Sequence, residues 1–301
     1  MKIIIGSRGS ALALWQSNWV RDRLAAAGHE AEVRVIRTSG DRLPQAALAA
    51  SGVKGLFIKE IEEALAAGSI QLAVHSLKDM PTDLPPGLKL AAVPEREDAR
   101  DVLVSNGGLG FAGLASGQRV GSSSVRRQSQ LLHLRPGLKM LPVRGNIDTR
   151  LRKLDEGEFD ALVLAAAGLA RLGFGSRIRE YFSIEQLCPA AGQGALGIET
   201  REASGPVAEA AASLDHPPAH AAVRAERALL RALGGGCAVP IAAYAASAGE
   251  SLALRGVVAS PSGERLLRAN ASGPATEPEK LGLRVADDLR RQGADEILGA
   301  R

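Results

Sequence analysis

The chain has 301 residues, of which 46% are hydrophobic and 23% charged, and its formal net charge is +4 at pH 7. This length exceeds one ordinary hydrophobic core, so we expect two or three domains. The modest charge excludes a general polycation, so any strong positive field has to come from local clustering.

The two cysteines, Cys188 and Cys237, are too few for a disulfide framework, and no cysteine–histidine spacing typical of zinc occurs. His216 and His220 have the spacing of a helical metal pair, but two prolines lie between them and a third ligand is missing, so we expect no metal. The three isoleucines at 3–5 are too short a run for a signal peptide, and no apolar stretch reaches 18 residues. We therefore expect a cytoplasmic protein with no membrane partner.

The first segment predicts a strand, a helix and a second strand. KIII at 2–5 is a buried strand, Ser10 caps a helix from Ala11 to about Ala27, and EVRVIRT at 32–38 is the next strand. This order implies a parallel sheet covered by helices. GLFIKEIEEALAAG at 55–68 predicts an amphipathic helix, followed by a strand at 71–77 and a proline-rich loop at 78–87.

A second lobe repeats this pattern. RVGSSS at 119–124 is a strand with a small-residue turn, and a helix at 125–134, a strand at 139–143 and a helix at 147–157 follow. In both lobes a Gly/Ser turn opens a helix, where backbone N–H groups favour an anion. Ser10, Ser123 and Ser124 either line such a site or only cap their helices.

The pattern of predicted elements changes after about Asp215. HPPAH at 216–220 suggests a linker, and a helix at 221–233, two strands within 251–271 and a closing helix at 281–292 form a third, smaller α/β domain. Cys237 follows three glycines on the turn after the first of these helices. The glycines favour an uncrowded, accessible thiol. The alternative is a buried, inert thiol, because free cysteines usually pack like small hydrophobic residues.

Arginines are concentrated in the second lobe. Between Arg119 and Leu154 there are seven arginines and two lysines against one acid, Asp148. Guanidinium groups suit carboxylates or phosphates, so a small polyanion held in a cleft between two lobes is the favoured ligand, with a solvated basic face as the alternative. The arginines at turns or helix starts are Arg8, Arg126, Arg127, Arg144 and Arg150.

Nucleic acid is disfavoured as a partner because aromatic residues make up only 3% of the chain. A two-lobed small-anion binding protein without catalysis remains an alternative, since two α/β lobes around a cleft are also the architecture of periplasmic binding proteins. Lys78 and Asp79 lie where a strand ends, the usual place for site residues in open α/β sheets, although Asp79 could instead cap a turn. The aperiodic stretch at 41–55 suggests a lid or a surface loop.

Eight segments in order along the chain resemble the porphobilinogen deaminase family. They are SRGSALALWQ at 7–16, KGLFIKEIE at 54–62, HSLKDMPTDLP at 75–85, EREDARDVLV at 95–104, GSSSVRRQSQL at 121–131, RGNIDTRLRKL at 144–154, CPAAGQGALGIE at 188–199 and LGGGCAVPIAAYA at 233–245. The resemblance implies a monomeric transferase of porphyrin and heme biosynthesis that polymerises four porphobilinogen molecules, with loss of ammonia, into hydroxymethylbilane. Each pyrrole carries acetate and propionate groups, which accounts for the arginines.

The resemblance also implies roles for individual residues. Cys237 would carry a dipyrromethane cofactor through a thioether, and Asp79 would be the catalytic carboxylate that stabilises the cation formed as ammonia leaves. The residues implied to bind the cofactor are Lys78, Ser123, Ser124, Arg126, Arg127 and Arg144. Those implied to bind the substrate are Arg8, Ser10, Arg150 and Gln193.

The expected fold is α/β with three domains, two of them similar doubly wound lobes. Lobe 1 would comprise 1–95 with 190–213, lobe 2 would comprise 96–189, and a small C-terminal domain with an antiparallel sheet would comprise 214–301.

Overall fold

The computed structural model describes residues 2–39, 58–203, 205–235 and 239–299. The chain divides into two compact units, Met1–Arg96 with Ala195–His220, and Glu97–Gly194 with Ala221–Arg301. The first unit is therefore discontinuous, with a return segment that supplies one strand and one helix. No helix within the described residues is both long and apolar enough to cross a membrane. The predicted division into three domains, and the cleft between lobes, stay predictions.

The first unit is built on a five-stranded sheet of order β2-β1-β3-β10-β4, in which β1 is parallel to β2 and β3, and β10 is antiparallel to β3 and β4. Its elements are β1 (Ile3–Ser7), α1 (Ala11–Ala26), β2 (Ala31–Val35), α4 (Lys59–Ala66), β3 (Leu72–Ser76), the 3-10 turn η1 (Leu77–Asp79), β4 (Leu88–Ala92), β10 (Leu196–Arg201) and α8 (Pro206–Ala212).

Strand alternation explains why helices cover both faces of this sheet. Ile3 and Ile5 pack with Leu24 of α1 on one face, whereas Ile4 packs with Leu65 of α4 on the other. The sheet is thus doubly wound, as predicted.

The second unit contains a five-stranded sheet of the same plan, of order β7-β6-β8-β5-β9. Its elements are β5 (Asp101–Ser105), the 3-10 turns η2 (Asn106–Gly108) and η3 (Phe111–Gly113), β6 (Arg119–Gly121), α5 (Val125–Leu134), β7 (Lys139–Leu141), α6 (Ile147–Asp155), β8 (Ala161–Ala165), α7 (Ala166–Arg171), the 3-10 turn η4 (Gly175–Arg177) and β9 (Glu180–Tyr181). Val102 packs with Leu154 of α6 on one face, and Leu103 packs with Leu131 of α5 on the other.

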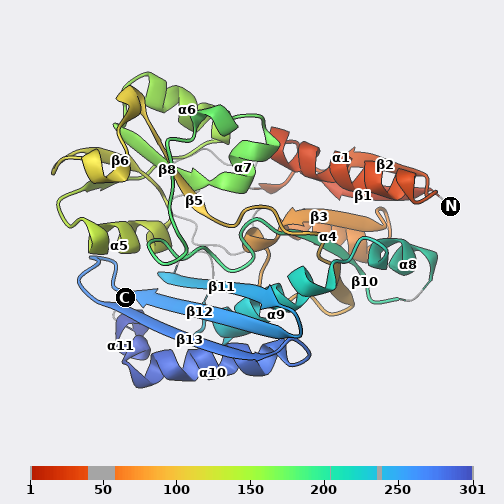
Figure 1. Cartoon of the computed structure of the whole chain (residues 1–301). Helices are drawn as coiled ribbons and strands as arrows, with labels where there is room; N and C mark the ends of the chain where they lie inside the picture. Colours follow the sequence, from red (N-terminus) through yellow and green to blue (C-terminus); the bar gives the residue numbers. More distant parts are fainter. Residues whose placement is uncertain (1, 40–57, 204, 236–238, 300–301) are drawn as a thin grey trace. The chain divides into compact units, whose positions relative to one another are not determined.

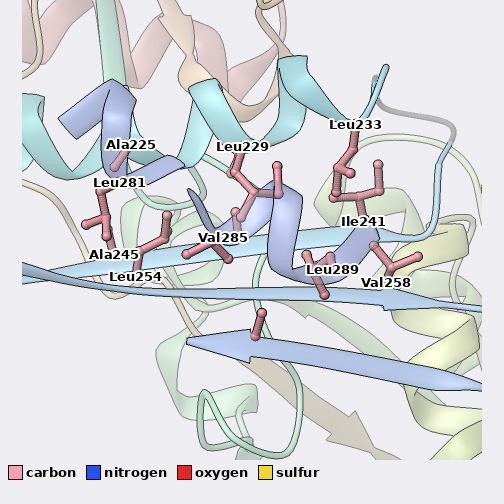
Figure 2. Packing of buried hydrophobic residues seen from close by; sticks show 14 of the residues in the cluster. Ala225, Leu229, Leu233, Ile241, Ala245, Leu254, Val258, Leu281, Val285 and Leu289 are labelled. Atoms are coloured by element: carbon pink, nitrogen blue, oxygen red, sulfur yellow. The ribbon is translucent and has the colours of Figure 1, made fainter. Parts of the chain in front are cut away.

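The second unit also contains an antiparallel sheet of order β11-β12-β13, covered by helices (Figure 1). Its elements are α9 (Pro217–Ala232), β11 (Ile241–Ala248), β12 (Ser251–Ala259), β13 (Leu266–Pro274), α10 (Pro278–Arg291) and α11 (Ala294–Gly299). Leu229 of α9 and Val285 and Leu289 of α10 pack against Leu254 and Val258 of β12 (Figure 2). The predicted α/β class, with two doubly wound sheets and one antiparallel sheet, is confirmed.

The predicted linker at 216–220 is wrong. Residues 217–220 form the first turn of α9, which begins at Pro217. Proline is well tolerated at a first helical position, because the N–H it lacks would have no partner inside the helix. His220 lies in this turn, and its Nδ1 is 2.8 Å from Asp215 Oδ1.

Candidate active site

Four of the predicted site residues belong to the edge of the first sheet where parallel strands end. Because β1 and β3 run in parallel, their carboxyl ends share that edge. Arg8 follows β1 directly, and Ser10 caps α1, its Oγ accepting a hydrogen bond from Ala13 N at 3.3 Å. Lys78 and Asp79 lie in η1, directly after β3. Ser10 thus caps the helix, and its role toward a ligand stays a prediction.

The turn that carries Asp79 is held from both sides within the first unit. Leu77 N donates to Ala195 O at 3.1 Å, and Gln16 Nε2 donates to Ser76 Oγ at 2.9 Å. The Leu77 side chain is buried, while Asp79 is exposed. A fixed turn thus presents an accessible carboxylate.

In the second unit, Ser123 and Ser124 follow the end of β6 and Arg144 follows the end of β7, which is parallel to β6, while Arg150 lies in α6. Ser124 caps α5, its Oγ accepting from Arg127 N at 3.4 Å, and Ser123 Oγ donates to Val143 O at 2.8 Å. Arg150 Nε donates to Gly145 O at 2.8 Å. Arg144 lies in the same turn after β7 and is half-buried. This edge therefore carries hydroxyl, guanidinium and helix N-terminal groups together.

Arg126 and Arg127 are buried in an ion-pair cluster with Asp101, whose side chain is fully buried. Asp101 Oδ2 accepts from Arg126 Nη1 at 2.7 Å, and Oδ1 accepts from Arg127 Nη2 at 2.7 Å and Nε at 2.9 Å. Burial acts to raise the pKa of Asp101, but the two guanidinium groups outweigh it and hold that pKa well below its usual range. Asp101 is therefore ionised.

Gln193 completes this cluster. It is fully buried, and its Nε2 donates to Ala99 O at 2.7 Å and to Asp101 Oδ1 at 2.9 Å, while its Oε1 accepts from Arg127 Nη2 at 3.4 Å. Arg126 Nε is buried and has no hydrogen-bond partner within the described residues. The cluster thus sets two guanidinium groups beside one carboxylate, and guanidinium groups suit an anionic ligand.

The sequence interpretation gave no role to Asp101 or to Arg171. Arg171 Nη2 donates to Gly194 O at 2.7 Å, and burial lowers the pKa of its guanidinium to about 10 against the opposing charge of Glu97. Asp101 could have been noticed in the sequence because it is an acid at the first position of an otherwise apolar strand. A carboxylate buried there needs positively charged or hydrogen-bonding partners.

Of the two cysteines, only Cys188 lies within the described residues. Cys188 is fully buried against Ala242 and Val257. Burial raises the pKa of its thiol to about 12, so this residue is unsuited to nucleophilic attack. Cys237 lies outside the described residues, as does the predicted lid at 41–55. Among the described residues, no group of three or more His, Cys, Asp or Glu side chains could hold a metal ion.

Known proteins similar to this chain fall into two groups. A family model described as "Porphobilinogen deaminase, dipyromethane cofactor binding domain" matches residues 3–209, and one described as "Porphobilinogen deaminase, C-terminal domain" matches residues 220–291. Porphobilinogen deaminase from Geobacter sulfurreducens is 50% identical over 299 residues, covering 99% of this chain and 94% of that protein. The Thiobacillus denitrificans protein of the same name is 50% identical over 300 residues, covering 99% of this chain and 98% of its own length.

The second group consists of solved structures of lower similarity. A periplasmic substrate-binding protein of an ABC transporter from Coxiella burnetii has a TM-score of 0.46 at 14% identity, covering 72% of this chain and 93% of that chain.

Proposed function

The chain belongs to the porphobilinogen deaminase family, and on that premise we propose how its residues divide the work of the family reaction. The enzyme joins four porphobilinogen molecules, each losing ammonia, into the linear tetrapyrrole hydroxymethylbilane on a dipyrromethane primer. The match of the chain to this family over nearly its whole length carries the conclusion. Membership also sets aside the alternative of a binding protein without catalysis.

Asp79 is the catalytic carboxylate in this proposal. It would accept hydrogen bonds from pyrrole N–H groups and stabilise the positive charge that develops on the substrate as ammonia leaves, because a fixed carboxylate is most effective where charge develops. Its exposure at the end of β3, on a turn held by Leu77 and Ser76, supports this role.

The dipyrromethane fits the donor groups on the second sheet. Its acetate and propionate groups match the guanidinium groups of the Arg126–Arg127–Asp101 cluster, in which Arg126 Nε has no hydrogen-bond partner among the described residues. When bound, this cofactor supplies the free pyrrole end to which new units are added. The residues that would hold it are Lys78, Ser123, Ser124, Arg126, Arg127 and Arg144, with Cys237 as the covalent thioether anchor.

Substrate carboxylates are assigned to the remaining predicted residues, which are Arg8, Ser10, Arg150 and Gln193. For Gln193 the contacts favour an indirect contribution, because both ends of its buried amide already engage the arginine cluster. We further propose a cytoplasmic monomer that binds neither membrane nor nucleic acid. The low aromatic content of 3% supports the last of these points.

The Asp79→Asn variant tests the catalytic assignment. We expect kcat to fall at least about 100-fold, as for loss of one preorganised electrostatic group, with the melting temperature unchanged because Asp79 is exposed. Asp83→Asn, at an exposed acid in the same loop, is the matched control and should retain parental turnover. Parental kcat in Asp79→Asn would overturn the assignment of Asp79.

A further inference from the structure

A buried polar contact lies behind the turn that carries Asp79. His75 of β3 is 6% exposed and Glu199 of β10 is fully buried, and His75 Nε2 lies 3.0 Å from Glu199 Oε2. Glu199 is thus the side-chain partner of this buried histidine. The two residues are 124 positions apart in the chain, so only the fold brings them together.

Both side chains lie on the face of the sheet that α4 covers. Val74 and Ile198 pack on the opposite face with α1 and α8, and side chains alternate along a strand. Ala73, two residues before His75, packs toward α4. The pair therefore lies between sheet and helix, in a layer built mostly of apolar side chains.

A third titratable group, Glu62 of α4, belongs to this layer. Burial and the charge of Glu199 raise the pKa of Glu62, with a smaller opposing effect from His75. The Oε1 atoms of Glu62 and Glu199 are buried and have no hydrogen-bond partner within the described part of the chain. One histidine and two carboxyl groups in a mostly apolar layer are a costly arrangement. Since well-packed apolar residues are often as stable as a buried ion pair, stability alone does not account for it.

Strand β10 is also the support of η1. Leu77 N donates to Ala195 O, just before β10 begins, at 3.1 Å. Gly197 of β10 has no side chain, and the side chains of Met80 and Leu77 pack directly against its backbone. A Cβ at this position would lie 2.6 Å from Met80 Sδ and 2.7 Å from Leu77 Cδ1. These two residues flank Lys78 and Asp79. The placement of β10 against β3 therefore determines where Asp79 is presented.

We propose that His75 and Glu199 form a positioning pair, whose buried contact fixes β10 against the end of β3 and so sets the position of the Asp79 carboxylate. Neither residue is assigned contact with substrate or cofactor. The proposal rests on the catalytic role proposed for Asp79.

The first experiment replaces both members of the pair at once, so that neither His75 nor Glu199 is left buried without the other. The double variant His75→Leu/Glu199→Leu should fold, and its kcat, normalised to the primer-loaded fraction measured by intact mass, should fall about tenfold while KM changes less than twofold. A displacement of about 1 Å can cost up to about 100-fold in rate, so a tenfold loss corresponds to a smaller shift. His75→Gln, whose amide can still donate to Glu199, should stay within about threefold of the parent.

Val74→Ala is the matched control, since it removes buried volume from the neighbouring residue on the opposite face. It should lower the melting temperature and leave kcat unchanged. If it lowers kcat as much as the double Leu variant does, the effect is general loss of stability and the positioning proposal is wrong. A parental kcat in the double Leu variant would also overturn it.

A second experiment asks whether the pair acts through Asp79. In an Asp79→Glu background the carboxylate is already displaced by one methylene, so introducing the double Leu variant should lower kcat by less than twofold further. Independent, multiplying losses would refute action through Asp79. Parental kcat in Asp79→Glu itself would show that the position of this carboxylate is not critical, which also refutes the proposal. Failure of the catalytic assignment itself is detected separately, by a parental kcat in the Asp79→Asn variant.

Discussion

Asp101→Asn should destabilise the second unit strongly. The carboxylate is fully buried and accepts hydrogen bonds from Arg126, Arg127 and Gln193. The amide keeps the shape but leaves two guanidinium groups, 4% and 7% exposed, without their anion. Breaking a buried ion pair by removing one partner costs about 3–5 kcal/mol. At about 2–4 °C per kcal/mol for a unit of this size, the midpoint of thermal unfolding should fall by about 6–20 °C at pH 7.

The assay is thermal unfolding followed by circular dichroism, with Asp98→Asn as the matched control. Asp98 pairs with Arg100 at 2.6 Å, but both side chains are partly exposed, so the loss should stay within about 1 kcal/mol. The pKa of Asp101 is lowered by folding, so its stabilisation is present above the unfolded value of about 3.9 and is lost as pH falls below it. The gap between parent and Asp101→Asn should therefore narrow below about pH 4. Equal melting shifts for Asp98→Asn and Asp101→Asn would refute the reasoning.

Two further outcomes follow from shifted pKa values. Burial raises the pKa of the Cys188 thiol to about 12, so this thiol should resist iodoacetamide at pH 8 in the folded protein and react once urea unfolds it. Peptide mass mapping measures the alkylation, and alkylation of Cys188 in the native protein within minutes would contradict this prediction. Burial and Glu199 raise the pKa of Glu62 above 4.5, so ionising this group costs the folded state stability as pH rises through that raised pKa. Glu62→Gln should therefore melt above the parent at pH 8 but not at pH 4, and a variant less stable than the parent at pH 8 would contradict it.

The parts of the fold that depend on local pattern were predictable from the sequence. The Ser10 cap predicted the start of α1 at Ala11, and the expected end at about Ala27 lies within one residue of the observed end at Ala26. The family motifs also picked out Lys78 and Asp79, which the structure places together in η1. Local signals sufficed here because caps, turns and periodicity act over a few residues.

Long-range pairing was not predictable in this way. Strand β10 inserts between β3 and β4 although it lies more than 100 residues further along the chain. The residues next to His75 in the sequence therefore do not predict its contact with Glu199. Asp101 likewise finds Arg126 25 residues further on and Gln193 92 residues further on. The start of α9 was misread because prolines that can open a helix look the same in sequence as prolines in a linker.

The central claim is that a primer built from substrate is attached to Cys237 and extended there. The intact mass of the purified protein, before and after incubation with porphobilinogen, tests this most directly, with Cys237→Ala beside it and Cys188→Ala as the matched control. We predict that the parent and Cys188→Ala carry two linked pyrrole units, or acquire them on incubation, and then gain further units stepwise, whereas Cys237→Ala keeps the mass of its sequence throughout. A parent that gains no mass from porphobilinogen and carries none beforehand, or a Cys237→Ala variant that is modified like the parent, would contradict the account.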